Sequence, residues 1–366
     1  MMEATHEAGR PVDMAGVVCH APADYENLAV ERLPRPPMRP HGVRIETHYA
    51  GVSFATTLIT ARKHQTKPPF PFVPGTEVSG IVTECAPEVT RLRVGDRVCS
   101  SPEWGGHAEE VVALEHNVFK LPDSLPLDVA VQMPLSYGTA YGALVWRARL
   151  QPGETLLVFG ASGAVGLAAV EVGKALGATV IACVGTPEKA DFARQHGADH
   201  ALLNDSEDLA GEIRRLSGGR GIDVTFDPVG GFAFDVAMKV AAGLGRIVLI
   251  GFASGQWPSI PGNILLVKNI DVLGFYFGRY IWDGVVPRVP WDRQVAEAFD
   301  ALFACHAEGR LRPSASHVFP LAEFRAAMRA VIERRGIGKV VLRMPVAGPA
   351  AGPGGGVEEG LLGAGR

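Results

Sequence analysis

The stretch TLLVFGASGAVGLAAVEVGKALGA, residues 155–178, decides the fold of half of this chain. An apolar strand ends directly in a glycine, two more glycines follow at steps of three, and a helix begins at once. Such glycines let the chain turn sharply, let backbone N–H groups approach a pyrophosphate, and let the helix pack close to the strand. A turn needed only for packing is the alternative. The pattern favours a dinucleotide site with candidate contacts at Gly160, Ser162, Gly163, Ala164, Val165 and Gly166.

The pattern of predicted strands and helices differs between the N-terminal part of the chain and the part that contains this turn. From about residue 151, strands such as TVIACV, IDVTFD and RIVLIG alternate with helix-length segments, which predicts an α/β fold with a doubly wound parallel sheet. Residues 14–120 read as short strands punctuated by Gly and Pro, which indicates a β-rich domain. Residues 278–345 are expected to return to this first domain. Residues 1–13 and the tail at 346–366, which is rich in Gly, Ala and Pro, are predicted to be disordered.

Charge and cysteine content exclude several classes of protein. The 366 residues carry 35 basic and 39 acidic side chains, for a formal charge of −4, without a basic run that would bind nucleic acid. The sequence shows neither an 18-residue apolar run nor a leader pattern, so we expect a soluble cytoplasmic protein without a membrane partner. Five scattered cysteines form no C-x-x-C pair, and neither a disulfide framework nor a structural zinc site is indicated.

The end of the second strand, in TVIACVGTPEKA, indicates which cofactor is used. NAD-binding proteins place an acidic side chain there to accept hydrogen bonds from the ribose 2′-hydroxyl, whereas this chain has Val184, Gly185 and Thr186. Gly185 leaves room for a 2′-phosphate, Thr186 offers a hydrogen bond, and Lys189 offers a positive charge. The sequence therefore favours NADPH over NADH, with a solvated surface lysine as the alternative reading of Lys189.

Four separated motifs carry a family resemblance: GVSFATTLITARKHQTKPPFPFVPGTEVSG at residues 51–80, PLSYGTAYGAL at 134–144, the glycine turn, and FDPVGG at 226–231. In this order they resemble the zinc-independent quinone oxidoreductases of the medium-chain dehydrogenase/reductase superfamily. The resemblance implies a GroES-like catalytic domain at 14–135, completed by 278–345, and a Rossmann NADPH-binding domain at 136–277. It also implies a cleft between the domains, a homodimer, and NADPH-dependent reduction of quinones or other conjugated carbonyl compounds.

The same resemblance bears on whether a metal takes part. Zinc alcohol dehydrogenases of the superfamily have a Cys-His pair where this chain has Ser53 and Phe54, a Gly-His-Glu turn where it has Gly75, Thr76 and Glu77, and another cysteine at Leu135. Catalytic zinc requires three protein ligands and an open position. We therefore predict no metal site, and Glu77 is expected to brace its turn through hydrogen bonds.

Candidate residues for the chemistry are fewer. Ser53 and Thr56, which replace the Asn and Asp of many relatives, are candidate donors to a substrate oxygen, with local backbone bonding as an equal alternative. Tyr137 and Thr139 match a family segment near the nicotinamide, with packing as the alternative for the Tyr137 ring. The resemblance adds cofactor contacts at Gly251, Phe252, Ala253 and Arg334, and leaves a contact from Asn204 in doubt. His64 and His107 are read as surface or packing residues.

Two further functions compete with quinone or enone reduction. The same scaffold supports an enoyl-thioester reductase, which would need room for a pantetheine arm and basic residues at the pocket mouth. A non-catalytic NADPH-binding protein is the other alternative, since Ser53 and Thr56 depart from the family pattern.

Overall fold

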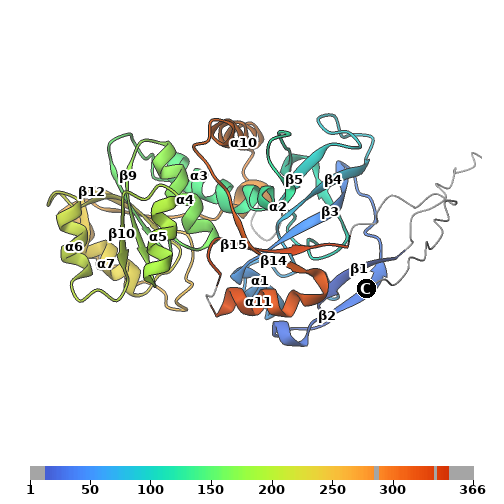
Figure 1. The fold of residues 1–366 in the computed structure, drawn as a ribbon, viewed down its shortest axis with the longest axis horizontal. Helices are drawn as coiled ribbons and strands as arrows, with labels where there is room; N and C mark the ends of the chain where they lie inside the picture. The colour runs from blue at the N-terminus through green and yellow to red at the C-terminus, as the bar shows by residue number, and fades with distance from the viewer. Residues whose placement is uncertain (1–12, 284–287, 334–335, 346–366) are drawn as a thin grey trace, which may run out of the picture.

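The computed structural model of the chain describes residues 13–283, 288–333 and 336–345. Two sheets lie side by side along the long axis, one built mainly from the middle of the chain and one from both ends (Figure 1). The predictions of disorder for residues 1–12 and 346–366 and of a cofactor contact at Arg334 lie outside the described residues. Asp13, predicted to be disordered, begins the first strand. Within the described ranges, the helices are all too short or too polar to cross a membrane.

The Rossmann sheet has six parallel strands in the order β10-β9-β8-β11-β12-β13. Their near-continuous apolar runs are buried because helices cover both faces. The predicted α/β fold with a doubly wound parallel sheet is therefore confirmed. The strands are β8 (Thr155–Phe159), β9 (Thr179–Val184), β10 (His200–Leu203), β11 (Ile222–Asp227), β12 (Ala241–Leu249) and β13 (Asp271–Gly274). The helices are α4 (Ala164–Ala175), α5 (Pro187–Gln195), α6 (Leu209–Leu216), α7 (Phe232–Val240) and α8 (Gly262–Lys268).

The second sheet is the GroES-like part, and its central strand is β3 (Gly42–Val52). One edge of β3 pairs with β4, while its other edge is shared by β6 over residues 42–46 and by β15 over residues 49–52. The strand order is β14-β15-β3-β4-β5-β7. The other strands are β4 (Val78–Cys85), β5 (Arg97–Ser100), β6 (Glu110–Leu114), β7 (Val118–Lys120), β14 (Ala315–Pro320) and β15 (Lys339–Arg343), and β1 (Asp13–Val18) and β2 (Ala29–Pro34) form a separate ribbon.

The C-terminal segment divides between the two halves. Strands β14 and β15 lie beside β3 in Figure 1, and helix α11 (Phe324–Ile332) packs on the same sheet. Helices α9 (Gly278–Ile281) and α10 (Asp292–Ala307) instead share a core with the Rossmann half. In that core Phe299 of α10 stacks on Phe119 with 3.5 Å between ring centroids. Strands β14 and β15 and helix α11 thus lie with the sheet of the first domain, while the apolar face of α10 contacts both halves. The return of 278–345 to the first domain stays a prediction.

Candidate active site

A cavity of about 530 Å³ is lined from both sheets. Its volume falls in the range usual for small-molecule and cofactor sites. Ten residues that the sequence singled out come together on its wall: Ser53, Thr139, Gly160, Ser162, Gly163, Ala164, Val165, Gly185, Lys189 and Ala253. Six others stand outside the lining: Thr56, Tyr137, Gly166, Thr186, Gly251 and Phe252.

The phosphate turn has the geometry that its glycines predict. Gly160 has φ +59°, a conformation in which side chains are disfavoured. A Cβ at Gly166 would stand 2.2 Å from the carbonyl oxygen of Gly160, so the third glycine allows the helix to pack against the turn. Helix α4 begins at Ala164, and the N–H groups of a first turn have no carbonyl partner within their own helix. This end of the cavity therefore presents donors and a positive helix end to an anion.

The end of β9 offers space and charge. A Cβ built on Gly185 meets nothing within 4 Å, so the backbone there leaves room at the cavity wall. Thr186 is the N-cap of α5, and its hydroxyl oxygen accepts a hydrogen bond from the N–H of Lys189 at 3.3 Å. Thr186 thus organises the start of the helix that carries Lys189, whose side chain lines the cavity.

Asn204 supplies a polar group whose role the sequence left in doubt. Its N–H donates to the carbonyl of Val184 at 2.8 Å, which fixes the residue at the end of the parallel strands. The side-chain oxygen Oδ1 is buried without a hydrogen-bond partner among the described residues, although Asn204 lines the cavity. An orphaned buried acceptor beside the phosphate turn fits a bound hydroxyl-bearing nucleotide, because such groups are normally paired.

The positions of the zinc ligands in related alcohol dehydrogenases are all on the cavity wall. Ser53, Thr76 and Leu135 offer neither thiolate nor imidazole there. Across the described ranges, no three His, Cys, Asp or Glu side chains come together in a way that could hold a metal ion.

Glu77 and Lys339 occupy the same region as a buried ion pair. Lys339 is the first residue of β15, and the preceding Gly338 donates its N–H to the carbonyl of Ser162 at 2.8 Å. Burial raises the pKa of Glu77, and the Lys339 ammonium and the Ser136 hydroxyl act against that rise. Glu77 therefore does more than brace its own turn, because it ties the last strand to the cavity wall beside the phosphate turn.

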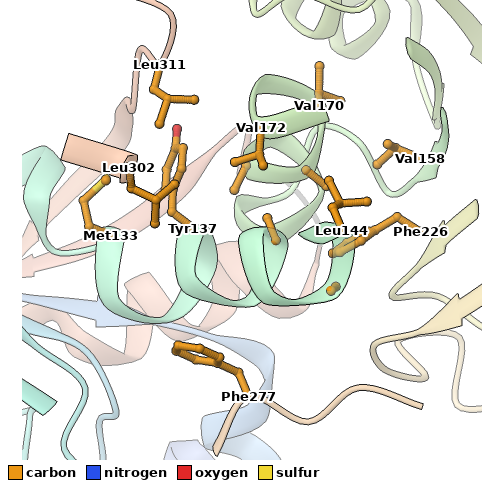
Figure 2. Close-up of a cluster of buried hydrophobic side chains, with 14 of the residues drawn as sticks. Met133, Tyr137, Leu144, Val158, Val170, Val172, Phe226, Phe277, Leu302 and Leu311 are labelled. Atoms are coloured by element: carbon orange, nitrogen blue, oxygen red, sulfur yellow. The ribbon is translucent and has the colours of Figure 1, made fainter. Parts of the chain in front are cut away.

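Tyr137 lies away from the cavity. The helical stretch of residues 133–147, which contains α3 (Gly138–Tyr141), carries Tyr137 on one side, and Phe277 from the segment after β13 lies against its other side in Figure 2. Phe277 lines the cavity, whereas Tyr137 does not. The Tyr137 ring is fully buried and its hydroxyl donates to Glu171 Oε2 at 2.7 Å. Burial raises the pKa of Tyr137, and the Glu171 carboxylate adds to that rise. This placement favours the packing alternative over a catalytic role for Tyr137.

The other predicted polar contacts divide in the same way. Ser53 lines the cavity, whereas Thr56 is buried behind it, with 3.4 Å between the two side-chain oxygens. Thr139 and Ala253 line the cavity. Phe252 instead turns outward and stacks on Trp257, and the cofactor contacts expected from Gly251 and Phe252 stay predictions.

The two histidines read as plain surface or packing residues differ sharply. His107 is fully buried, its Nε2 lies 3.1 Å from the carbonyl oxygen of Gly51, and burial lowers its pKa to about 4. A Cβ on Gly75 would come within 2.4 Å of its ring, which explains the glycine of the turn. His64 lines the cavity, and no sequence pattern predicts this, because its neighbours there come from distant segments.

Comparison with known proteins identifies the class that this geometry defines. Residues 39–123 match the family described as alcohol dehydrogenase GroES-like domain, and residues 164–290 match the family described as zinc-binding dehydrogenase. The chain is 39% identical to a bovine quinone oxidoreductase-like protein 2 over 87% of this chain and 89% of that protein. The fold and site are those of a medium-chain dehydrogenase/reductase. Within that superfamily the chain belongs to the quinone oxidoreductase-like family, and it is an oxidoreductase.

Two other relatives bear on cofactor and substrate. A mycobacterial protein solved as a complex with NADPH superposes with a TM-score of 0.82 at 28% identity, covering 90% of this chain and all of that one. A 2-haloacrylate reductase from a Burkholderia species is 30% identical over 90% of this chain and 98% of its own length.

Proposed function

We propose that this protein is an NADPH-dependent reductase that transfers a hydride to a quinone or another conjugated carbonyl acceptor without a metal. One observation carries the proposal: a single cavity joins the phosphate turn to Ser53, Thr76 and Leu135, the positions where related alcohol dehydrogenases hold zinc. A site with a dinucleotide cradle, in which the described residues bring no three metal-binding side chains together, suits acceptors that need little electrophilic help.

The preference for NADPH is supported by the end of β9. Open space at Gly185 and the ammonium of Lys189 suit a 2′-phosphate, and none of Val184, Gly185 and Thr186 at the end of β9 is acidic. The NADPH complex of the mycobacterial relative agrees with this choice. The nucleotide would be held by residues of the phosphate turn, by Asn204 and by Lys189.

The type of acceptor determines what the protein must contribute to the reaction. When bound, NADPH supplies a hydride from its nicotinamide ring. A conjugated acceptor spreads the resulting negative charge over its π system, so the protein chiefly aligns the reactants, excludes water and offers hydrogen bonds to the oxygen. The apolar wall of the cavity, which includes Phe54, Leu135, Phe277 and Trp282, suits a flat conjugated molecule. The Burkholderia relative is named as a reductase of 2-haloacrylate, an acid in which a C=C bond is conjugated with the carboxyl group.

We also propose a homodimer. Strand β13 stands at the end of the Rossmann sheet, and Leu244, Leu266 and Val267 near it are between 75% and 80% exposed. Among the residues that the structure describes, the outer edge of β13 pairs with no strand, and such an edge beside exposed apolar side chains suits a second copy of the chain. Val267→Asp should then shift the protein towards the monomer in sedimentation.

All five cysteines are free, which supports the proposal of a cytoplasmic location, where thiols stay reduced.

An isotope experiment tests the proposed reaction. Purified protein is supplied with NADPH carrying deuterium at C4, and with quinones, short enones and enoyl thioesters in parallel. Direct transfer places deuterium at the far carbon of an enone, while the second hydrogen comes from solvent. Preference for enoyl thioesters would redirect the assignment to acyl chains. Tight NADPH binding with no turnover, or faster turnover of saturated alcohols, would contradict the proposal.

A further inference from the structure

The acceptor end of the cavity offers few hydrogen-bond donors. Ser136 and Lys339 both donate to Glu77, so the Ser136 hydroxyl and one N–H of the Lys339 ammonium are already engaged. The Ser53 hydroxyl lies within 3.4 Å of Thr56 Oγ1. An acceptor oxygen that gains negative charge needs a donor aimed at it, because unpaired charge in a dry site is costly.

His64 has a ring nitrogen available for this purpose. The N–H of Thr66 donates to His64 Nδ1 at 3.1 Å, which fixes Nδ1 as the acceptor of the ring. Burial lowers the pKa of His64, so the imidazole is neutral near pH 7. A neutral imidazole that accepts at Nδ1 carries its proton on Nε2. In the part of the chain that the structure describes, no residue accepts a hydrogen bond from this Nε2–H.

Thr66 and Tyr276 hold the ring in place from two domains. The Thr66 hydroxyl lies 3.4 Å from the hydroxyl of Tyr276, which follows β13, and the His64 and Tyr276 rings stand 6.4 Å apart between centroids. Tyr276 in turn packs edge-on against Trp282. Since the Nδ1 edge of His64 faces its own loop, the Nε2 edge is the part of the ring left for the cavity that His64 lines.

We infer that His64 is a catalytic residue whose Nε2–H hydrogen-bonds the carbonyl oxygen of the acceptor as the hydride arrives. The inference rests on the proposed function. The far carbon of the enone gains a C–H bond, the π electrons of its C=C bond shift towards the carbonyl, and the oxygen carries the charge while NADPH is oxidised to NADP⁺. A proton from water then completes the α carbon. His64 keeps its own proton throughout and acts as a fixed donor, as neutral imidazoles do in other enzymes.

Three variants test the inference by kinetics. His64→Phe keeps a flat ring but removes the donor, and the loss of one oxyanion donor lowers kcat/KM for enones by about 100-fold. His64→Gln restores an N–H and should recover about tenfold of that loss. Lys63→Ala, an exposed neighbour that does not line the cavity, is the matched control and should behave as wild type.

Two measurements without turnover separate this inference from the proposed function. Nitrogen NMR of the free protein should show the His64 proton on Nε2. 4-Nitrophenolate, whose oxygen carries negative charge like the reacting oxygen, should bind about tenfold more weakly to His64→Phe, while 4-nitroanisole should bind both proteins equally.

A proton on Nδ1, or equal phenolate affinity in wild type and His64→Phe, would overturn the role of His64. If wild type reduces no conjugated carbonyl, the proposed function fails, and the tautomer and the phenolate titration alone decide whether His64 binds an anionic oxygen.

Discussion

The ammonium of Lys339 and the carboxylate of Glu77 form an ion pair between residues 262 positions apart, with side chains 2% and 0% exposed. The pair joins the last strand to the turn before β4 and stands beside the cavity. Removing one partner leaves the other as a buried charge without a counter-ion. Removing both partners leaves no buried charge at this place.

Single substitutions in this pair should therefore destabilise the protein strongly. We expect Glu77→Gln or Lys339→Met to lower the free energy of unfolding by about 3–5 kcal/mol, and the double variant to lose less than either. Urea denaturation measures this. The exposed pair of Arg293 and Glu297 provides the control, and Glu297→Gln there should cost at most about 1 kcal/mol. Single variants no more costly than this control would contradict the prediction.

Cofactor choice should depend on the end of β9. Lys189→Ala should weaken NADPH binding by about 1–3 kcal/mol while NADH binding barely changes, because only NADPH presents a 2′-phosphate. Gly185→Asp, whose side chain has open space, should shift the preference towards NADH. Fluorescence titration measures both, with Lys239→Ala, outside the cavity, as the control. Equal losses for the two nucleotides in Lys189→Ala would show that the lysine does not read the phosphate.

Metal removal should have no effect. Because Ser53, Thr76 and Leu135 supply no strong zinc ligand, exhaustive chelation should leave reductase activity and melting temperature unchanged. Elemental analysis of the purified protein should find no stoichiometric zinc. One tightly held zinc per chain would overturn this prediction.

Acid should weaken the fold through His107. Its folded pKa of about 4 lies below the ordinary value of 6.5, so the unfolded chain binds a proton between these pH values and the folded chain does not. Stability from this group is complete above pH 6.5 and is lost as pH falls towards 4, by about 1.4 kcal/mol per pH unit in the middle of the window. His107→Gln keeps a donor for Gly51 but removes the proton uptake, and its curve of unfolding free energy against pH should be flatter. Parallel curves would refute the assignment.

The sequence predicts local features of this molecule well and distant contacts poorly. The phosphate turn could be read from Gly160, Gly163 and Gly166, because its requirements lie within one strand, turn and helix. His64 and Lys339 could not, since their partners Tyr276 and Glu77 are more than 200 residues away along the chain. The family resemblance predicted that Tyr137 lies near the nicotinamide. The structure places Tyr137 on a helix beside the cavity, but on the side of that helix that faces away from it.

The pairing of β3 with β15 has a consequence for synthesis on the ribosome. In the described structure, residues 49–52 of one β3 edge pair with β15, so the nascent chain carries that part of the edge open until almost all of the protein has been made. Chains grow at about 5–20 residues per second, which leaves the edge exposed for about 15–60 s. An open strand edge invites pairing with other chains, so this protein should depend on chaperones during translation more than a protein whose sheets close in sequence order.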